Sequence, residues 1–305
     1  MKRVLIVGHK GQDGRILSEL LRRQGHYVLG VGRGDMDLTD SLAVADFLEK
    51  EKPDEIYYLA AYHHSSEDRR VSSEAELFRN SFDVHVLGVV AFLNGMQQVL
   101  RGGKLFYAAS SHVFGDVNEF PQNELTPFRP VNIYGISKSA GIEACRYYRR
   151  MHGVHASCGI LYNHESGYRS EKFVSKKIVN GALAILLGKR TSLPLGNLDA
   201  RIDWGYAPDY VEAMQSIIAE ELPDDYIIAT GITHSVREFV EAVFSRLGLN
   251  WEEYVTVDKG LITKNEKQGV LVGDFNKLNK RTGWEPKTGF SQMIHLMLEQ
   301  HKNEN

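Results

Sequence analysis

The chain has 305 residues, and its 36 Lys and Arg against 39 Asp and Glu give a formal net charge of −3. This balance argues against a nucleic-acid partner bound through a basic face. The two cysteines, Cys145 and Cys158, are too few for a disulfide framework or for a zinc site built on paired cysteines.

Length and hydropathy set further bounds. At about 150 residues per domain, the chain is long enough for two domains. The first apolar run ends at Gly8, short of a signal-peptide core, and no later run approaches the roughly 20 apolar residues of a membrane span. We therefore expect a cytoplasmic protein without a membrane partner.

Strands and helices are predicted to alternate along the first half of the chain. In chain order they are a strand at Lys2–Val7, a helix at Ile16–Arg23, a strand at Tyr27–Val31, a helix at Ser41–Lys50, a strand at Glu55–Ala61, a helix at Phe82–Val99 and a strand at Lys104–Ala109. This alternation predicts an α/β fold with a doubly wound parallel Rossmann sheet.

The second half is less regular. Helices are expected at Arg169–Leu187, Ala207–Glu220, Ser235–Leu247 and Phe290–His301, with a short strand at Tyr226–Ala229. The chain has only eight prolines and no low-complexity linker. We therefore expect a small C-terminal α/β domain packed closely against the first domain.

The turn after the first strand carries the spacing G-x-x-G-x-x-G at Gly8, Gly11 and Gly14. Such glycines let the backbone approach a pyrophosphate, and the N-terminus of the next helix offers it free N–H groups. The alternative is an ordinary strand-to-helix turn. The residues predicted to bind a dinucleotide are Gly8, Lys10, Gly11, Gln12, Asp13, Gly14, Arg33, Asp37, Leu38, Leu59, Ala60, Ala61, Tyr134 and Lys138.

The end of the second strand bears on the choice of dinucleotide. An NAD site places an acidic side chain there for the ribose hydroxyls, whereas this chain has Arg33, which suits a 2′-phosphate. Lys10 adds positive charge. NADP(H) is therefore favoured over NAD(H). NAD(H) remains the alternative if Asp35 or Asp37 bends back to the ribose.

A second motif indicates proton transfer. Tyr134 and Lys138 lie four residues apart at the start of a predicted helix, so their side chains share one face. A nearby ammonium is expected to lower the pKa of the tyrosine, which then exchanges a proton with a sugar hydroxyl. Ser110, Ser111 and His112 follow the fourth strand and complete the predicted catalytic set. The alternative is a purely structural Tyr–Lys pair.

Together these motifs resemble the extended short-chain dehydrogenase/reductases, and within them the GDP-mannose 4,6-dehydratase family. The segments that carry the resemblance are Gly11–Gly14, Asp37–Asp40, Tyr134 with Lys138, Gly159–Ser166, Phe173–Ile178, Leu195–Asp199, Asp203–Gly205, Asp209–Val211 and Gly273–Asp274. The resemblance implies a nucleotide-diphosphate sugar as substrate. It also implies hydride removal at C4, loss of water across C5 and C6, and return of the hydride to C6.

The resemblance also implies roles for particular residues. Tyr134 and Lys138 form the proton-relay pair, and Ser110 stands where the family has a threonine that binds the sugar 4-hydroxyl. The residues expected to bind the sugar nucleotide are Asn163, Glu165, Arg169, Lys177, Asn197 and Arg201. The implied division is a dinucleotide-binding domain over 1–164, rejoined by 206–232, and a sugar-nucleotide domain over 165–205 and 233–305.

The chain departs from the family pattern at four places. His112 stands where the family has the glutamate that eliminates water; an imidazole can serve as an acid or base, or it can simply pack. Ile202 stands where the family has an arginine, and the neighbouring Arg201 is a candidate to take over its role. Lys264–Lys267 stands where the family has an Arg-Pro-x-Glu segment. The short connection Gly32–Met36 resembles that of the 4-keto reductases and predicts a homodimer.

Four functions remain open from these observations. The leading one is a 4,6-dehydratase of a GDP-linked hexose that uses His112, and the alternative is a reductase of a 4-keto-6-deoxy sugar nucleotide. A 4-epimerase or 4-dehydrogenase is third, and a cofactor-sensing regulator without chemistry is the non-enzyme alternative. His63 and His64 follow the third strand without further metal ligands at suitable spacing, so no metal is expected.

Overall fold

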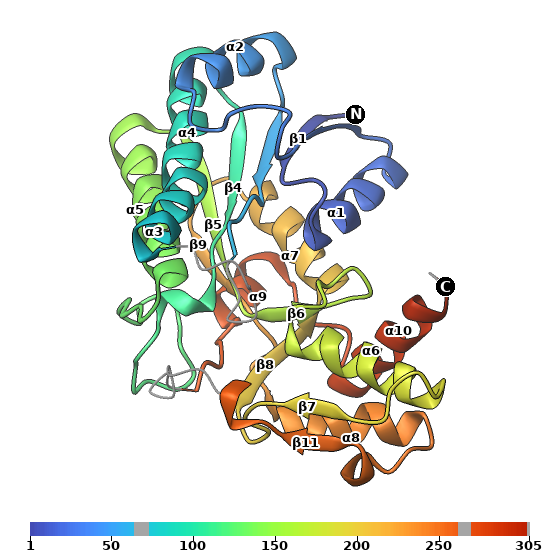
Figure 1. Ribbon diagram of the computed structural model, residues 1–305. Helices are drawn as coiled ribbons and strands as arrows, with labels where there is room; N and C mark the ends of the chain where they lie inside the picture. The colour runs from blue at the N-terminus through green and yellow to red at the C-terminus, as the bar shows by residue number, and fades with distance from the viewer. Residues whose placement is uncertain (64–72, 262–269, 304–305) are drawn as a thin grey trace.

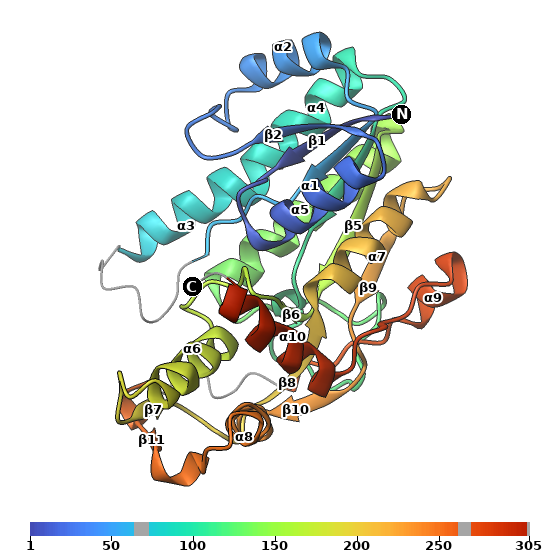
Figure 2. The same ribbon diagram turned by 90° about the vertical axis from the view of Figure 1, so that its right-hand side faces the viewer.

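The computed structural model describes residues 1–63, 73–261 and 270–303, so His64 and the segment Lys264–Lys267 lie outside the described residues. Figures 1 and 2 show an upper part built on one large sheet and a lower part that contains the C-terminal helix. The six strands of the large sheet lie in the spatial order β2 (Tyr27–Val31), β1 (Arg3–Val7), β3 (Glu55–Tyr58), β4 (Lys104–Ala108), β5 (His155–Leu161) and β9 (Asp225–Ile228).

All neighbouring strands of this sheet are parallel, which confirms the predicted doubly wound α/β fold. The strand order reverses between β1 and β3, and ligands bind such sheets at the carboxyl ends beside that switch point. Strand β2 lies at the edge of the sheet, and a short connection leads from Val31 to α2.

Helices cover both faces of the sheet, as Figure 1 shows. The helices around it are α1 (Gln12–Arg23), α2 (Ser41–Glu51), α4 (Gly88–Val99), α5 (Ile133–His152) and α7 (Ala207–Ala219). Side chains alternate along β1: Leu5 and Val7 pack with α2, α4 and α5, whereas Val4 and Ile6 pack with α1 and α7. A strand buried on both faces explains the continuous apolar run at the start of the sequence.

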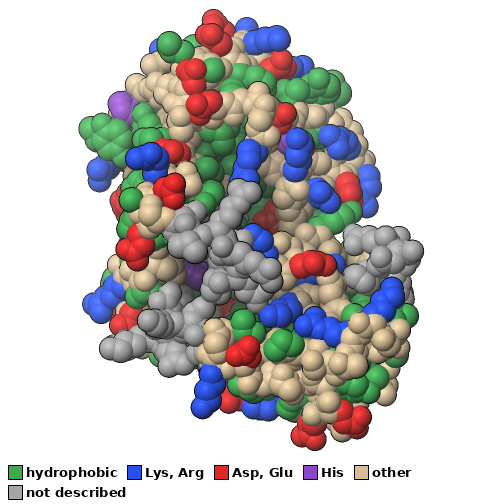
Figure 3. Space-filling view, viewed as in Figure 1, with side chains coloured by type: hydrophobic (Ala, Val, Ile, Leu, Met, Phe, Trp, Pro, Cys, Tyr) green, Lys and Arg blue, Asp and Glu red, His purple; other side chains and the backbone are tan. Residues whose placement is uncertain are grey.

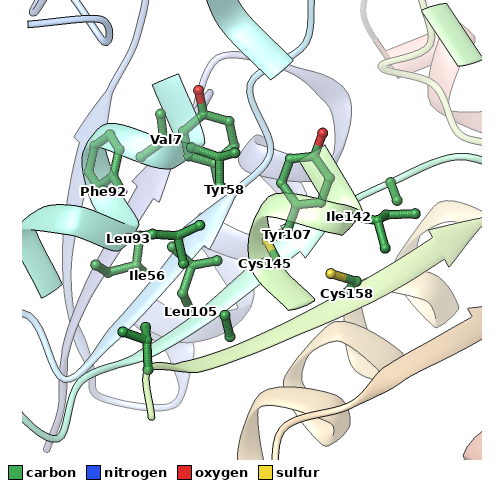
Figure 4. Packing of buried hydrophobic residues seen from close by; sticks show 14 of the residues in the cluster. Val7, Ile56, Tyr58, Phe92, Leu93, Leu105, Tyr107, Ile142, Cys145 and Cys158 are labelled. Carbon is green, nitrogen blue, oxygen red and sulfur yellow. The ribbon is translucent and has the colours of Figure 1, made fainter. Parts of the chain in front are cut away.

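Large side chains fill the core beneath α4 and α5. Tyr58 and Tyr107 extend from neighbouring strands toward the helices, and Phe92 meets the Tyr58 ring edge-on at 5.6 Å between centroids. Figure 4 also shows Cys145 of α5 and Cys158 of β5 in this core. Both cysteines are buried free thiols, which agrees with the absence of a disulfide framework predicted from their number.

The helix predicted at Phe82–Val99 begins earlier and is interrupted. It consists of α3 (Glu74–Phe82), a π-helical segment η1 (Asp83–Leu87) and α4. Ser73 and Glu76 form a capping box that starts α3, a signal that hydrophobic spacing alone did not reveal. The π-helical segment carries His85, and such segments occur frequently at functional sites.

Two further differences concern the middle of the chain. The predicted helix at Arg169–Leu187 begins only at Val174, because the residues before it form a hydrogen-bonded turn that approaches the sheet edge. Strand β5 was not predicted, although it pairs with both β4 and β9. Its polar start, His155, and its small residues weaken the apolar signal in the sequence.

The lower part has its own hydrophobic core. Its elements, together with the strands and helix that link it to the sheet, are β6 (Asn163–Glu165), α6 (Val174–Leu186), β7 (Leu193–Leu195), β8 (Arg201–Tyr206), β10 (Thr233–Ser235), α8 (Val236–Arg246), β11 (Val255–Val257), α9 (Asn276–Thr282) and α10 (Phe290–Asn303). Trp204 packs against Phe239 and Phe290 in this core. Within the described ranges, no helix combines the length and apolar character needed to span a membrane.

A buried carboxylate ties the lower part to the sheet. Asp203 of β8 accepts hydrogen bonds from the backbone and hydroxyl of Thr230, at 3.0 and 2.6 Å. It also accepts from the N–H groups of Gly231 and Gly273, at 3.0 and 3.2 Å. Three chain segments are therefore held by one side chain that is 1% exposed.

We expect Asp203→Ala to lower the free energy of unfolding by about 3 kcal/mol, because it leaves several buried donors unpaired. Urea denaturation followed by circular dichroism measures this change. Asp199→Ala is the matched control, since the Asp199 side chain is 77% exposed in its ion pair with Arg237. The control should change stability by less than about 1 kcal/mol. Equal losses in both variants would contradict the role given to Asp203.

Candidate active site

A cavity of about 220 Å³ lies at the carboxyl ends of the central strands, where the two parts of the chain meet. The sequence-predicted residues that line it are Gln12, Asp13, Leu59, Ala61, Ser110, His112, Tyr134, Lys138, Asn163 and Arg169. The structure adds His63, Ala108, Ala109, Leu161, Tyr162, His164 and Phe173. Residues far apart in sequence thus form one site at the carboxyl edge of the sheet.

The glycine turn is closely packed and leaves the start of α1 open. Gly8 has φ +94°, and a Cβ there would lie 2.8 Å from the backbone nitrogen of Ala60. A Cβ on Gly14 would lie 2.5 Å from the carbonyl oxygen of Gly8. Gly11 is the N-cap of α1 and supplies no side-chain cap, so the first N–H groups of the helix are left for a ligand. This geometry fits a dinucleotide pyrophosphate.

Lys138 is buried below the cavity. Its ammonium donates a hydrogen bond to the Ala108 carbonyl oxygen at 2.7 Å and lies 5.0 Å from the centre of the Tyr107 ring. Burial lowers the pKa of Lys138 to about 7. Near neutral pH this lysine therefore gains or loses a proton readily, which suits a proton relay.

Tyr134 lies one helical turn before Lys138, with its ring 5.7 Å from the ammonium. Burial raises the pKa of Tyr134 to about 12, with a smaller opposing effect from Arg169. The expectation that Lys138 lowers the pKa of this tyrosine is therefore wrong for this structure. Desolvation dominates because the ammonium is directed at the Ala108 carbonyl.

Three histidine rings meet the Tyr134 ring edge-on. The centroid separations are 5.4 Å for His63, 5.1 Å for His85 and 5.8 Å for His112. They come from the segment after β3, from η1 and from the turn after β4. Three imidazole side chains thus contact Tyr134. Of these, only His112 was predicted from the sequence to be catalytic.

His85 was not predicted, and its hydrogen bonds determine its protonation. The Tyr62 N–H donates to His85 Nε2 at 2.9 Å, so Nε2 carries no proton. His85 Nδ1 therefore donates to the Ser137 hydroxyl at 2.8 Å, and Ser137 donates to the Tyr134 carbonyl oxygen. Burial lowers the pKa of His85 to about 2, so this neutral imidazole supports the first turn of α5.

The glycine turn is joined to the motif at Asn163–Ser166. His164 Nε2 lies 3.0 Å from Asp13 Oδ2, and its Nδ1 lies 2.7 Å from the Tyr162 carbonyl oxygen. Both ring nitrogens face acceptors, so both carry protons and the imidazole is cationic. Although burial opposes it, Asp13 raises the pKa of His164, and the pKa of Asp13 is lowered.

Gln12 adds two hydrogen bonds to the same junction. Its amide donates to the His164 carbonyl oxygen at 3.1 Å and accepts from the Ser166 hydroxyl at 2.8 Å. The predicted cofactor residues Gln12 and Asp13 thus connect the glycine turn to the segment Asn163–Ser166. His164 was missed because nothing in the sequence marks two residues 151 positions apart as partners.

Arg169 is held above the cavity by two neighbours. Its Nε lies 3.0 Å from Glu165 Oε2, and its guanidinium lies 3.5 Å from the centre of the Phe173 ring. Glu165 is 1% exposed and also accepts from Ser175 at 2.6 Å. Glu165 does not belong to the cavity lining, so the structure presents it as a support for Arg169.

The end of β2 carries mixed charge. Arg33 is exposed there, and Lys10 lies 3.9 Å from Asp35. Asp35 bends back and accepts from the Gly32 N–H at 2.8 Å, whereas Asp37 accepts from the backbone and hydroxyl of Thr39. Asp37 is therefore a turn residue, and the charged groups at the end of β2 are Arg33, Lys10 and Asp35.

The remaining predicted substrate residues lie outside the cavity lining. Asn197 is exposed and accepts from the Asp199 N–H, which makes it a turn residue. Arg201 donates to the Thr233 carbonyl oxygen at 2.7 Å on the neighbouring strand. Lys177 is half-buried on α6. Their roles as substrate ligands stay predictions.

The remaining predicted residues support the site from behind. Ser111 is buried, Ala60 packs against the Gly8 turn, and Leu38 packs against the core under α4.

In the part of the chain that the structure describes, no group of three or more His, Cys, Asp or Glu side chains is arranged to hold a metal ion. Figure 3 shows Lys and Arg side chains on both sides of the boundary between the two parts. That distribution suits an anionic ligand.

Comparison with known proteins gives a consistent family. A family model described as GDP-mannose 4,6 dehydratase matches residues 34–297. The chain is 36% identical to GDP-mannose 4,6 dehydratase 1 of Arabidopsis thaliana, with 98% of this chain and 89% of that protein covered. It is 34% identical to GDP-mannose 4,6 dehydratase of Homo sapiens, with 96% and 90% covered.

Solved structures share the fold at lower identity. RMD from Pseudomonas aeruginosa complexed with NADPH superposes with a TM-score of 0.87 at 21% identity, and each chain is fully covered. The dTDP-glucose 4,6-dehydratase from Bacillus anthracis in complex with NAD has a TM-score of 0.83 at 15% identity. That comparison covers 100% of this chain and 98% of the other.

The Asp13–His164 pair predicts a pH-dependent stability. The raised pKa of His164 contributes stability that is lost as the pH rises through it, and the lowered pKa of Asp13 contributes stability that is lost at acidic pH. Asp13→Asn should therefore reduce the free energy of unfolding more at about pH 6 than at about pH 9. Urea unfolding at both pH values measures the difference. A loss that is the same at both would show that the ion pair does not form.

Proposed function

The chain belongs to the GDP-mannose 4,6 dehydratase family of enzymes, and on that premise we propose that it transfers a hydride at C4 of a GDP-linked hexose. The observation that carries this proposal is the meeting of Ser110, Tyr134 and Lys138 in one cavity beside the glycine turn. When bound, a nicotinamide dinucleotide supplies the acceptor or donor of that hydride. A binding protein without chemistry has no need of a buried lysine beneath a half-buried tyrosine.

The chain's own residues move the proton of the 4-hydroxyl. Tyr134 takes this proton in its phenolate form as the C4–H bond breaks, and the resulting phenol returns it in the reverse direction. Lys138, with its pKa near neutrality, stabilises that phenolate while its ammonium is charged. Ser110 orients the hydroxyl, since its side chain lines the same cavity at the N-cap of the turn after β4. Asn163 and Arg169 face the sugar and its diphosphate.

Two net reactions use this step. In 4,6-dehydration, water is lost across C5 and C6 and the hydride ends at C6, with His112 at the position of the family's glutamate. In 4-keto reduction, the hydride enters at C4 and no water is lost. Family membership supports the first reaction. The short connection Gly32–Met36 and the replacement of the glutamate support the second.

For the cofactor we propose a preference for NADP(H). Arg33 and Lys10 place two cations near the end of β2, where a 2′-phosphate of the cofactor would lie. Asp35 occupies part of this region, where its carboxylate contacts Lys10 and the Gly32 N–H. NAD(H) remains the alternative because a carboxylate at this position suits the ribose hydroxyls.

We also propose a homodimer of a cytoplasmic enzyme. Apolar side chains are exposed on the outer surfaces of α3, η1 and α5, namely Phe78, Leu87, Tyr147 and Met151. These elements pack against one another on one face of the sheet. Pairing of two such helical surfaces would remove these side chains from water.

The proposed step is tested with GDP-mannose and NADP⁺, by following product mass and nicotinamide absorbance. We expect oxidation at C4 in the wild type. Tyr134→Phe should lower its rate by about 10²–10⁴-fold, because the proton acceptor is removed. Tyr27→Phe is a matched control at an exposed tyrosine of β2, and should retain the wild-type rate. Unchanged turnover in Tyr134→Phe would rule out the assigned step.

The cofactor preference is tested by Arg33→Ala. Loss of one charge-assisted contact to the 2′-phosphate should weaken NADPH binding about tenfold and leave NADH binding within about twofold. Cofactor fluorescence titration measures both affinities, and Arg22→Ala, at an exposed arginine of α1, is the control. Equal effects on the two cofactors would favour the NAD(H) alternative with Asp35 at the ribose.

A further inference from the structure

His112 is bonded to the residue that caps α5. Asn132 is the N-cap of this helix, and its Oδ1 accepts from the Gly135 N–H at 2.8 Å. Its Nδ2 lies 3.0 Å from His112 Nδ1. Gly135 has no side chain to separate the helix from the turn after β4, and a Cβ there would clash with the His112 carbonyl oxygen. The first turn of α5 therefore lies directly against His112.

These contacts allow one arrangement of protons. The Gly135 N–H needs an acceptor, so the amide oxygen of Asn132 faces the helix and the amide N–H₂ faces His112. His112 Nδ1 must then accept a hydrogen bond, and the proton of the neutral ring resides on Nε2. Turning the amide over would point two donors at each other. Turning the imidazole would place a carbon against the amide and lose the bond.

The other titratable groups around His112 do not oppose this arrangement. The Tyr134 ring contacts the rings of His112, His63 and His85. Of these, His85 is a neutral imidazole. Asp13 is the one carboxylate among the described lining residues, and it is engaged with His164. No described lining residue thus offers a free carboxylate as a base.

We propose that Asn132 holds His112 in the Nε2–H form, so that His112 donates a hydrogen bond to the bound sugar and C4 is oxidised and reduced without loss of water. This inference rests on the proposed hydride transfer at C4 and selects among its net reactions. Asn132 is then a positioning residue that acts through His112.

The chemistry of water loss shows why the tautomer matters. A base must take the proton from C5, the C5–C6 double bond forms, the C6–O bond breaks, and the oxygen leaves as water after receiving a proton. An imidazole whose Nε2 already carries a proton cannot accept the one from C5 at that nitrogen. Its second nitrogen is occupied by the Asn132 amide. The hydride step at C4 needs only Tyr134, Lys138 and Ser110.

Asn132→Asp reverses the arrangement with little change of shape. The new carboxylate still accepts from the Gly135 N–H, and its other oxygen now accepts from His112 Nδ1–H. That leaves Nε2 free to act as a base. General base catalysis contributes about 10²–10⁴-fold, so we expect water loss from the C4-oxidised sugar to rise about 100-fold in this variant. Deuterium from D₂O should also enter at C5.

The matched control is Asn250→Asp, which makes the same substitution at another capping asparagine on the surface. It should behave as the wild type, with C4 oxidation but neither water loss nor deuterium at C5. ¹⁵N NMR of histidine-labelled protein supplies a readout that does not depend on activity. His112→Gln assigns the resonance, and we expect a protonated Nε2 in the wild type and a protonated Nδ1 in Asn132→Asp.

Each outcome decides one question. Loss of water by the wild type at a rate that His112→Gln abolishes would overturn the inference, as would a protonated Nδ1 in the wild-type spectrum. Absence of C4 oxidation in every variant would overturn the proposed function, and the NMR spectrum would still test the tautomer. Deuterium at C5 in Asn132→Asp alone supports the inference.

Discussion

The hydrogen bond from the buried Lys138 ammonium to the Ala108 carbonyl oxygen is the contact on which the site depends. It joins the first turns of α5 to the end of β4, and so fixes Tyr134 relative to Ser110 and His112. Burial of a cation without a carboxylate is costly, which is why the pKa of Lys138 falls to about 7. The same burial makes the lysine useful near neutral pH, because small changes in its surroundings alter its charge.

A second set of contacts joins the glycine turn to the segment Asn163–Ser166. Gln12 and Asp13, the first two residues of α1, bond to the backbone and side chains of His164 and Ser166. A ligand at the start of α1 and a ligand beside Asn163–Ser166 would therefore both lie next to these hydrogen-bonded side chains. Asp203 adds a separate tie between β8 and the end of β9, so the two parts have more than one fixed connection.

The strands of the first half were predicted closely because residues buried on both faces leave a continuous apolar run, as at Arg3–Val7. Helix limits were predicted less well. The capping box at Ser73 and the π-helical segment around His85 arise from local hydrogen bonds that hydrophobic spacing does not report. Strand β5 was missed because its polar start, His155, and its small residues weaken the apolar signal that marks a buried strand.

The sequence by itself determined the fold class, because strands and helices alternate over its first half. It also located the glycine turn and the Tyr134–Lys138 pair, because the residues of each lie within one or two helical turns of one another. Only the tertiary structure decided what these residues meet. It revealed the neutral His85, the cationic His164 and the Asn132 amide at His112, since each protonation state is set by a partner on another element. It also reversed the expected pKa shift of Tyr134, because desolvation depends on everything packed around a group and not on its neighbours in sequence.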